Sequence, residues 1–139
     1  MSKIYKFALV FVLAITSFVD ISEGIFDLGE VYVRVNNTLS NGKKLRIFCK
    51  SKDDDLSAVE LAPLQVYKFT ISKSFWGDTL FSCDVFFDNK SHWFDVFNQK
   101  RDTSFCRNTC YYEVMESRVC KYKKFNSKIV EDCYYWKKD

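Results

Sequence analysis

The chain contains a single histidine, His92, and this scarcity excludes several classes of enzyme. A ribonuclease with two catalytic histidines and a metalloprotease with an H-E-x-x-H helix both need more imidazole groups than the chain has. A serine hydrolase of the triad type would have to use His92, and the sequence contains no G-x-S-x-G motif. We therefore predict that the protein is not an enzyme, and that His92 is a surface or edge residue of a strand beside Trp93.

Proline and glycine are also scarce, with one proline and four glycines among 139 residues. This composition excludes collagen-like, proline-rich and glycine-rich linker architectures. Gly29, Gly42 and Gly77 are too far apart in the sequence to form a phosphate-binding loop, and we expect no cofactor. The 21 basic and 18 acidic residues give a net charge of +3, which calls for no nucleic acid as a partner.

The first 24 residues have the layout of a secretory signal peptide. Lys3 and Lys6 precede an apolar run over residues 7–19, and the small residues Ser22 and Gly24 follow it. The run is shorter than a membrane-spanning helix needs, although a membrane anchor or a buried core helix is the alternative. We predict a signal peptide over 1–24 and one secreted, extracellular domain over 25–139 that does not enter a membrane.

Six cysteines follow the predicted cleavage site, an even number that suits three disulfide bonds in an oxidising compartment. They are Cys49, Cys83, Cys106, Cys110, Cys120 and Cys133. The residues alone do not choose among about 15 pairings. A zinc site at Cys106-x-x-x-Cys110 is the alternative, but a secreted chain with one histidine favours disulfides, and we expect no metal.

Two N-glycosylation sequons agree with export from the cell. Asn36 begins Asn36-Asn37-Thr38, and Asn89 begins Asn89-Lys90-Ser91. Because such tripeptides also arise by chance, they support the secreted interpretation without proving it.

Apolar residues with a period of two predict strands over most of the remaining chain. Val31, Val33 and Val35 alternate with polar or aromatic residues, and the same pattern covers 45–49 and 80–87. Asn41-Gly42 suits the tight turn between the first two of these runs. Further candidates are 66–72, 92–99, 110–115 and 119–124. Seven short strands with many aromatic residues predict an all-β antiparallel sandwich.

The C-terminal tail from 118 to 139 is rich in lysine and differs from the rest of the domain. Ile129, Cys133 and Trp136 have a spacing that fits one face of a helix, which predicts a short terminal helix. Because of its positive charge, we expect the tail to form a solvated surface or a surface that contacts polyanions, with any binding of phosphate being incidental.

Asp53-Asp54-Asp55 is the most conspicuous polar run in the chain. It does not fit a calcium loop, because the sixth position is Ala58 instead of glycine and the twelfth is Leu64 instead of glutamate. We interpret the run as a solvated turn, with a contact surface for a basic partner as the alternative.

These motifs resemble the plant self-incompatibility S1 family, whose members are secreted S-protein homologues. The segment Cys49-Lys50-Ser51-Lys52-Asp53-Asp54-Asp55-Leu56 is similar to the family's most specific motif. The similarity begins with V-R-V-N-N at 33–37 and continues through W-G-D-T-L-F-S-C at 76–83 and Arg101-Asp102 to Cys106 and C-Y-Y-E-V at 110–114. Tyr112 stands where the family usually has tryptophan.

The resemblance implies a small, non-enzymatic β-sandwich that acts as a ligand for a cell-surface membrane protein, with a role in the rejection of self pollen in its best-known members. A monomer is expected. Cys120 and Cys133 lie outside the four usual family cysteines, so we predict that they pair with each other and that the other four form two bridges. The residues expected to contact a partner lie in three polar loops and are Asp53, Asp54, Asp55, Asn89, Lys90, Arg101 and Asp102.

Two other functions remain open at this point. One is a secreted hydrolase or cationic defence protein that acts on wall polymers or microbes through the carboxylates or the basic tail. The other is a protein inhibitor that presents a loop, which would use the same rigid scaffold.

Overall fold

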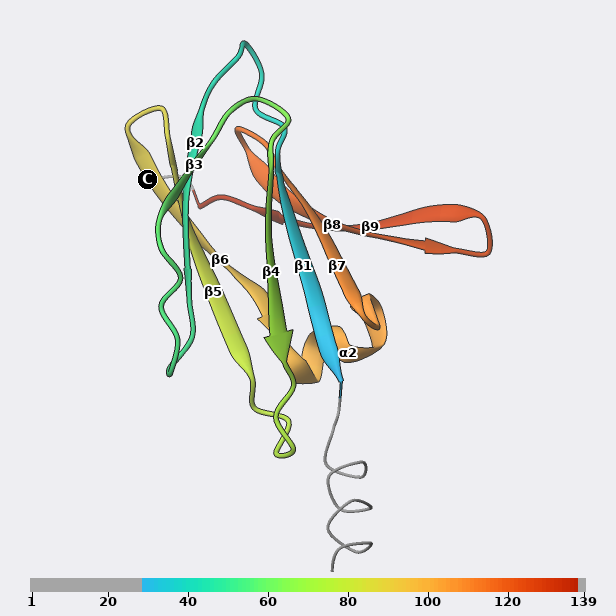
Figure 1. Ribbon diagram of the computed structural model, residues 1–139. Helices are drawn as coiled ribbons and strands as arrows, with labels where there is room; N and C mark the ends of the chain where they lie inside the picture. The colour runs from blue at the N-terminus through green and yellow to red at the C-terminus, as the bar shows by residue number, and fades with distance from the viewer. Residues whose placement is uncertain (1–28, 138–139) are drawn as a thin grey trace, which may run out of the picture.

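The computed structural model describes residues 29–137 and forms a sandwich of two β-sheets with one short helix (Figure 1). One sheet has the strand order β4-β1-β7-β8-β9 and the other has the order β3-β2-β5-β6. The strands are β1 Glu30–Asn37, β2 Leu45–Lys50, β3 Val59–Leu61, β4 Val66–Ser72, β5 Leu80–Phe87, β6 Lys90–Asn98, β7 Thr109–Val114, β8 Arg118–Phe125 and β9 Lys128–Tyr135. The helix, α2, covers Gln99–Cys106. The predicted all-β sandwich is therefore confirmed, and the predicted signal peptide over 1–24 lies outside the described residues.

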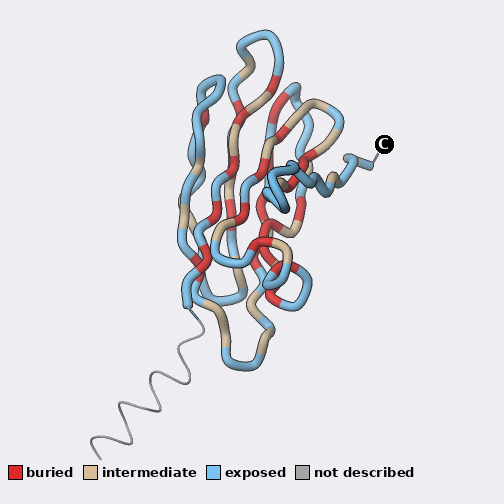
Figure 2. The backbone as a smooth tube through the Cα atoms, turned by 90° about the vertical axis from the view of Figure 1, so that its right-hand side faces the viewer, coloured by how far each residue is buried: buried red, intermediate tan, exposed pale blue. Residues whose placement is uncertain are grey.

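Period-two strands build the core by pointing alternate side chains between the sheets. In β1, Val31, Val33 and Val35 are fully buried, while the residues between them are exposed. Cys49 of β2 and Cys83 of β5 are also fully buried and are register partners on adjacent strands of the second sheet. Figure 2 shows the result, with buried segments along the strands and exposed segments at the loops. This burial follows the sequence pattern because successive side chains of a strand point to opposite faces.

Two tight turns have the backbone that their residues favour. Asn41 and Gly42 both have positive φ between β1 and β2, as the sequence predicts. Asp88 and Asn89 also have positive φ and form the two-residue turn between β5 and β6. Asparagine, aspartate and glycine tolerate this left-handed conformation better than other residues do.

The predicted terminal helix is wrong, because residues 128–135 form β9. Asn126 and Ser127 have positive φ and turn the chain back, so that β9 pairs with β8 in antiparallel register. Cys120 lies opposite Cys133 in this register. The helical spacing of Ile129, Cys133 and Trp136 is therefore coincidental. Most residues of β9 are exposed, so the sequence has no alternation of apolar and polar residues that would reveal the strand.

A second difference lies before β7, where α2 replaces the polar loop that we expected around Arg101 and Asp102. The Asn98 side chain caps the helix by accepting a hydrogen bond from the Arg101 N–H at 3.3 Å. Gln99 then fixes the helix to the β4–β5 loop, because its amide donates to Ser74 O at 2.7 Å and accepts from Ser74 N at 2.8 Å. These contacts come from residues 25 positions apart, which local sequence patterns do not reveal.

Candidate functional site

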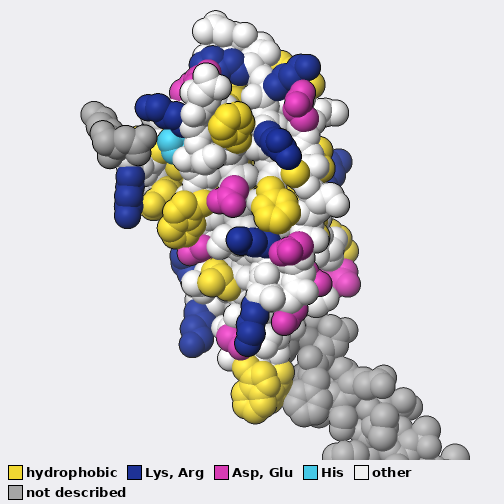
Figure 3. All heavy atoms as spheres, turned by 90° about the vertical axis from the view of Figure 1, so that its left-hand side faces the viewer, with side chains coloured by type: hydrophobic (Ala, Val, Ile, Leu, Met, Phe, Trp, Pro, Cys, Tyr) yellow, Lys and Arg dark blue, Asp and Glu magenta, His cyan; other side chains and the backbone are white. Residues whose placement is uncertain are grey.

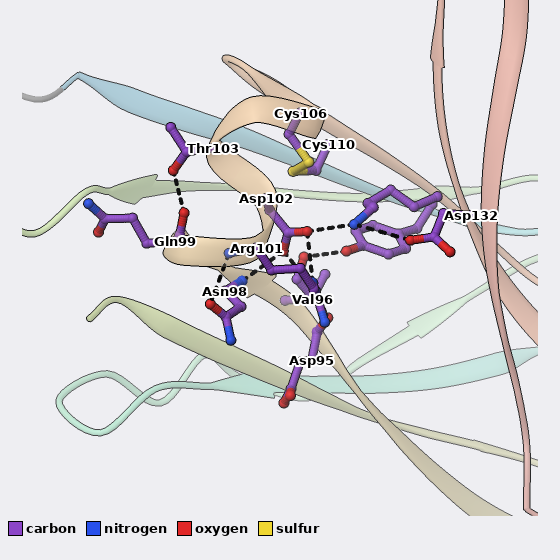
Figure 4. The surroundings of a disulfide bond; sticks show 12 residues. Asp95, Val96, Asn98, Gln99, Arg101, Asp102, Thr103, Cys106, Cys110 and Asp132 are labelled. Carbon is purple, nitrogen blue, oxygen red and sulfur yellow. Dashed lines mark hydrogen bonds and ion pairs between the residues drawn. A yellow bond between two sulfur atoms is a disulfide. The ribbon is translucent and has the colours of Figure 1, made fainter. Parts of the chain in front are cut away.

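The candidate site begins with Asp102, which is fully buried at the centre of a charged cluster (Figure 4). One of its carboxylate oxygens accepts from Lys121 Nζ at 2.5 Å and from Arg101 Nε at 2.8 Å. The other oxygen accepts from Arg101 Nη2 at 2.7 Å and from the Asn98 N–H at 2.8 Å. Four hydrogen bonds therefore meet at one carboxylate: two come from Arg101 in the same helix, one comes from the end of β6 and one comes from β8.

The cluster keeps Asp102 ionised in spite of its burial. Burial raises the pKa of Asp102, but the hydrogen bonds from Arg101 and Lys121 outweigh that effect and hold the pKa below its ordinary value. The same contact with Asp102 raises the pKa of Arg101 against the opposing effect of its own burial. A buried charge with this many donors is stable only while all its partners remain.

The burial of Asp102 corrects one sequence prediction. A residue with no exposed surface cannot touch a partner, so Asp102 is a structural residue and not a contact residue. Arg101, its neighbour, does reach the surface, and its Nη2 also donates to the Asp95 carbonyl at 2.7 Å. The two residues of the Arg-Asp motif thus have different environments.

Tyr112 and Phe105 complete the surroundings of the cluster. The buried Tyr112 hydroxyl donates to Val96 O at 2.6 Å, and burial raises the pKa of Tyr112 strongly. The Phe105 ring lies beneath two ammonium groups, with Lys121 Nζ at 4.5 Å and Lys123 Nζ at 4.4 Å from its centroid. These contacts hold the start of the β8–β9 hairpin against α2.

Three disulfides fix the elements around this cluster. Cys49–Cys83 joins β2 to β5, and Cys106–Cys110 joins the end of α2 to the start of β7. Cys120–Cys133 joins β8 to β9, which is the pair that the family resemblance implied. Because Cys106 and Cys110 are bonded to each other, their sulfur atoms are not available as zinc ligands.

A groove opens beside the cluster, between β6, α2 and the β8–β9 hairpin, with a volume of about 210 Å³. Its walls include two exposed aromatic side chains, Trp93 and Tyr134, which are 60% and 45% exposed. Arg101 and Lys121 provide basic groups, and Asp95 and Asp132 provide acidic groups. Figure 4 shows Arg101 of α2 and Asp132 of β9 beside the Asp102 cluster, whereas the Asp95 carboxylate points away from it.

The acidic run forms an exposed loop at the same end of the sandwich as α2 (Figure 1). Ser51 Oγ accepts from the backbone N–H groups of Asp53 at 3.3 Å and Asp54 at 3.0 Å. The backbones of Asp55 and Lys50 pair in an isolated antiparallel β-bridge. The three aspartates are exposed to solvent, and the hydrogen bonds to Ser51 fix the backbone of the turn that carries them.

The β4–β5 loop lies at this same end and carries an aromatic pair that sequence reasoning missed as a contact candidate (Figure 1). Phe75 and Trp76 meet edge to face with centroids 5.2 Å apart, and Trp76 is 80% exposed. The sequence did contain a signal for this loop, namely the pair Trp76-Gly77. Glycine tolerates the positive φ that Gly77 has in the turn, and the motif that begins at Trp76 continues into β5.

The remaining predicted contact residues, Asn89 and Lys90, lie at the opposite end of the sandwich from Asp53–Asp55. Both are exposed at the β5–β6 turn, so the Asn89 sequon is accessible. The other sequon residue, Asn36, is half-buried in β1, and its side-chain oxygen is buried without a hydrogen-bond partner. The structure therefore does not bring all the predicted contact residues onto one surface.

His92 lies on β6, an edge strand, as the sequence predicts. Its ring stacks on Trp136 with centroids 4.7 Å apart and also lies 5.4 Å from the Phe87 ring. The single imidazole thus helps to pack the C-terminal segment against the sandwich.

On the outer face of the β3-β2-β5-β6 sheet, hydrophobic side chains lie among basic and acidic ones (Figure 3). Phe86, Trp93 and Leu80 are each exposed on its strands β5 and β6. Within residues 29–137, no helix is long and apolar enough to cross a membrane.

Comparisons with known proteins agree on one family. The model of the plant self-incompatibility protein S1 family matches residues 32–136. S-protein homolog 20 of Arabidopsis thaliana is 34% identical over 127 residues, which cover 90% of each chain. S-protein homolog 18 of Arabidopsis thaliana is 37% identical over 92 residues, which cover 66% of this chain and 69% of the relative.

A solved structure supports the fold. It is described as a structure of self-incompatibility protein homologues, "a widespread family of small, highly stable, secreted proteins from plants", and it matches with a TM-score of 0.57 at 11% identity. The match covers 78% of this chain and 96% of the other. These matches lead to one conclusion: the chain belongs to the plant self-incompatibility protein S1 family.

Proposed function

We propose that the protein is exported and acts as a non-enzymatic recognition ligand for a membrane protein on a plant cell surface, with a role in the rejection of self pollen. Membership of the S1 family and the three disulfides support export, because such bridges persist in oxidising compartments. A rigid, cross-linked scaffold also suits recognition, since loops that are already ordered lose little entropy on binding.

The observation that carries this proposal is the exposed Trp76 at the loop end of the sandwich. Tryptophan is enriched among the residues that dominate binding energy, and charged residues commonly surround such an anchor. The Asp53–Asp55 loop supplies acidic groups at this same end, and Gln99 holds the aromatic loop in place through Ser74. The partner surface should therefore offer an apolar pocket with basic groups beside it.

The local chemistry also argues against the hydrolase alternative. His92 is stacked on the Trp136 ring and lies against the tilted Phe87 ring, and Asp102 is buried in ion pairs that hold it ionised. A general acid would need a raised pKa and access to a substrate, and Asp102 has neither.

The proposal is tested by titrating the oxidised, fluorescently labelled protein onto pollen tubes and leaf protoplasts. We expect saturable binding that unlabelled protein displaces, and a loss of affinity of about 30-fold for Trp76→Ala. Leu64→Ala is the matched control, because Leu64 is 74% exposed at the opposite end of the sandwich. Binding that does not saturate, or an equal loss in both variants, would contradict the proposal.

A cationic defence protein is the second candidate, and the tip of the β8–β9 hairpin favours it. Lys124 and Lys128 lie there with Phe125 and Ile129, which are both exposed. Exposed apolar groups beside lysines bind anionic membranes. Dye release from anionic vesicles, abolished by Lys124→Glu with Lys128→Glu, would favour this candidate; intact vesicles together with saturable cell binding would favour the recognition ligand.

A further inference from the structure

We propose that the groove between β6, α2 and the β8–β9 hairpin is a binding site for a neutral glycan. This site lies apart from the Trp76 loop and does not depend on the recognition function proposed above. It is the concave surface that adjoins the Asp102 cluster, and its walls come from segments far apart in the chain.

The groove is rigid on each of its three sides. Asp102 ties α2 to Lys121 of β8, and Cys106–Cys110 ties the end of α2 to β7. Cys120–Cys133 holds β9, and therefore Asp132 and Tyr134, against β8. A site whose walls are already fixed binds a small ligand without the cost of ordering them.

Two aromatic residues line the groove, and both side chains are exposed to water in spite of their size. Trp93 comes from β6 and Tyr134 from β9. Tyr134 lies with its centroid 6.2 Å from the Trp136 ring, which packs on Phe94, so its position is set by neighbouring rings. Aromatic faces of this kind stack against the C–H faces of sugar rings, which are apolar on one side and edged by hydroxyl groups.

The polar groups of the groove have hydrogen-bonding capacity that their neighbours among residues 29–137 do not use. The Asp95 carboxylate accepts from Ser82 through Oδ1 and points away from the Asp102 cluster, so the charged pair that faces a ligand is Lys121 and Asp132. Lys121 Nζ lies 3.9 Å from Asp132 Oδ2, too far for a direct hydrogen bond. A ligand hydroxyl between these two atoms could accept from the ammonium and donate to the carboxylate.

The charge balance of the groove selects a neutral ligand. The two basic residues Arg101 and Lys121 are matched by Asp95 and Asp132 on its walls, and Asp102 adds a buried negative charge behind them. An anionic sugar would meet more negative than positive charge, whereas hydroxyl groups can pair with either sign. Neutral glycans occur in wall polymers and on glycoproteins, and both sources share this chemistry.

The test uses the full secreted protein and three probes: cellohexaose, a high-mannose N-glycan and trigalacturonic acid. Calorimetry and tryptophan fluorescence report binding. We expect at least one neutral glycan to bind, Trp93→Ala or Tyr134→Ala to weaken it about tenfold, and Trp93→Tyr to retain it. Cellohexaose or the N-glycan as the preferred ligand distinguishes wall from glycoprotein as the source.

Trp76→Ala is the matched control, because it removes an exposed tryptophan outside the groove. Far-ultraviolet circular dichroism and thermal unfolding establish that each variant is folded. The proposal is overturned if neither neutral glycan binds, if only trigalacturonic acid binds, or if Trp76→Ala weakens binding as much as Trp93→Ala. Cell-surface binding that depends on Trp76 alone, without glycan binding, would remove this inference and leave the proposed function standing.

Discussion

Asp102 and the Asp53–Asp55 run are both acidic parts of family-like motifs, yet the fold gives them opposite environments. Asp102 has no exposed surface and is held by Arg101, Lys121 and the Asn98 backbone. The three aspartates of the run are exposed, and only the backbone beneath them is fixed, through Ser51. The comparison teaches that one acidic motif maintains the structure while the other is available to a partner.

The largest expected effect comes from breaking the buried side of this comparison. Asp102→Asn keeps the shape of the side chain but removes the charge that pairs with Lys121 at 2.5 Å, and leaves this buried ammonium with the exposed Asp132 carboxylate 3.9 Å away. We expect the free energy of unfolding to fall by roughly 3–5 kcal/mol, measured by urea denaturation. Asp54→Asn is the exposed control and should change it by less than about 0.5 kcal/mol. Equal losses would show that the two environments do not differ as the structure describes.

The next effect concerns the hairpin that carries Lys121. Replacing Cys120 and Cys133 together with serine opens a loop with a sequence separation of 13 and should destabilise the protein by about 3 kcal/mol. Mapping disulfide-linked peptides in the unaltered protein checks the pairing first. A peptide that links Cys133 to Cys49 would contradict the arrangement of β8 and β9 described above.

A smaller effect should follow pH. Because the pKa of Asp102 is lower in the folded chain than its ordinary value of about 3.9, its ionised form stabilises the fold above that value. This contribution is lost as the pH falls through the lowered pKa of the folded state. Unfolding measured from about pH 5 to pH 2 should therefore show a steeper loss in the unaltered protein than in Asp102→Asn. Parallel curves would refute the role assigned to the carboxylate.

The smallest effect on stability is expected when Asp53, Asp54 and Asp55 are all changed to asparagine. The free energy of unfolding should change by about 0.5 kcal/mol or less, because these side chains are exposed. Association with cells should slow and lose its dependence on salt, since rim charges act mainly on the association rate. Association kinetics that match those of the unaltered protein would place the contact surface elsewhere.

The sandwich itself could be predicted from the sequence because its strands are buried on one face. Val31, Val33 and Val35 alternate with exposed residues, and the turn at Asn41-Gly42 follows from local backbone preferences. Strand β9 could not be predicted in the same way, since most of its residues are exposed and their burial has no period. Its partner is set by the turn at 126–127 and by the register with β8.

The candidate site was harder to predict than the fold, because its contacts join distant residues. The adjacent residues Arg101 and Asp102 do not indicate that the Asp102 side chain is buried. Its burial depends on the ion pair with Lys121, which lies 19 positions away in the sequence. Helix α2 likewise depends on Gln99 binding Ser74, and the groove exists only once β6, α2 and β9 meet. The exposed Asp53–Asp55 loop was predicted correctly as solvated, because a polar run needs no distant partner to remain at the surface.

Mass spectrometry of the protein recovered from the fluid between plant cells tests the central claim most directly. If the molecule is an exported, cross-linked ligand, its chain should start at Ile25, and all six cysteines should resist alkylation until a reductant is added. A protein that is found only inside cells, retains residues 1–24 and reacts at once with a thiol reagent would contradict the account.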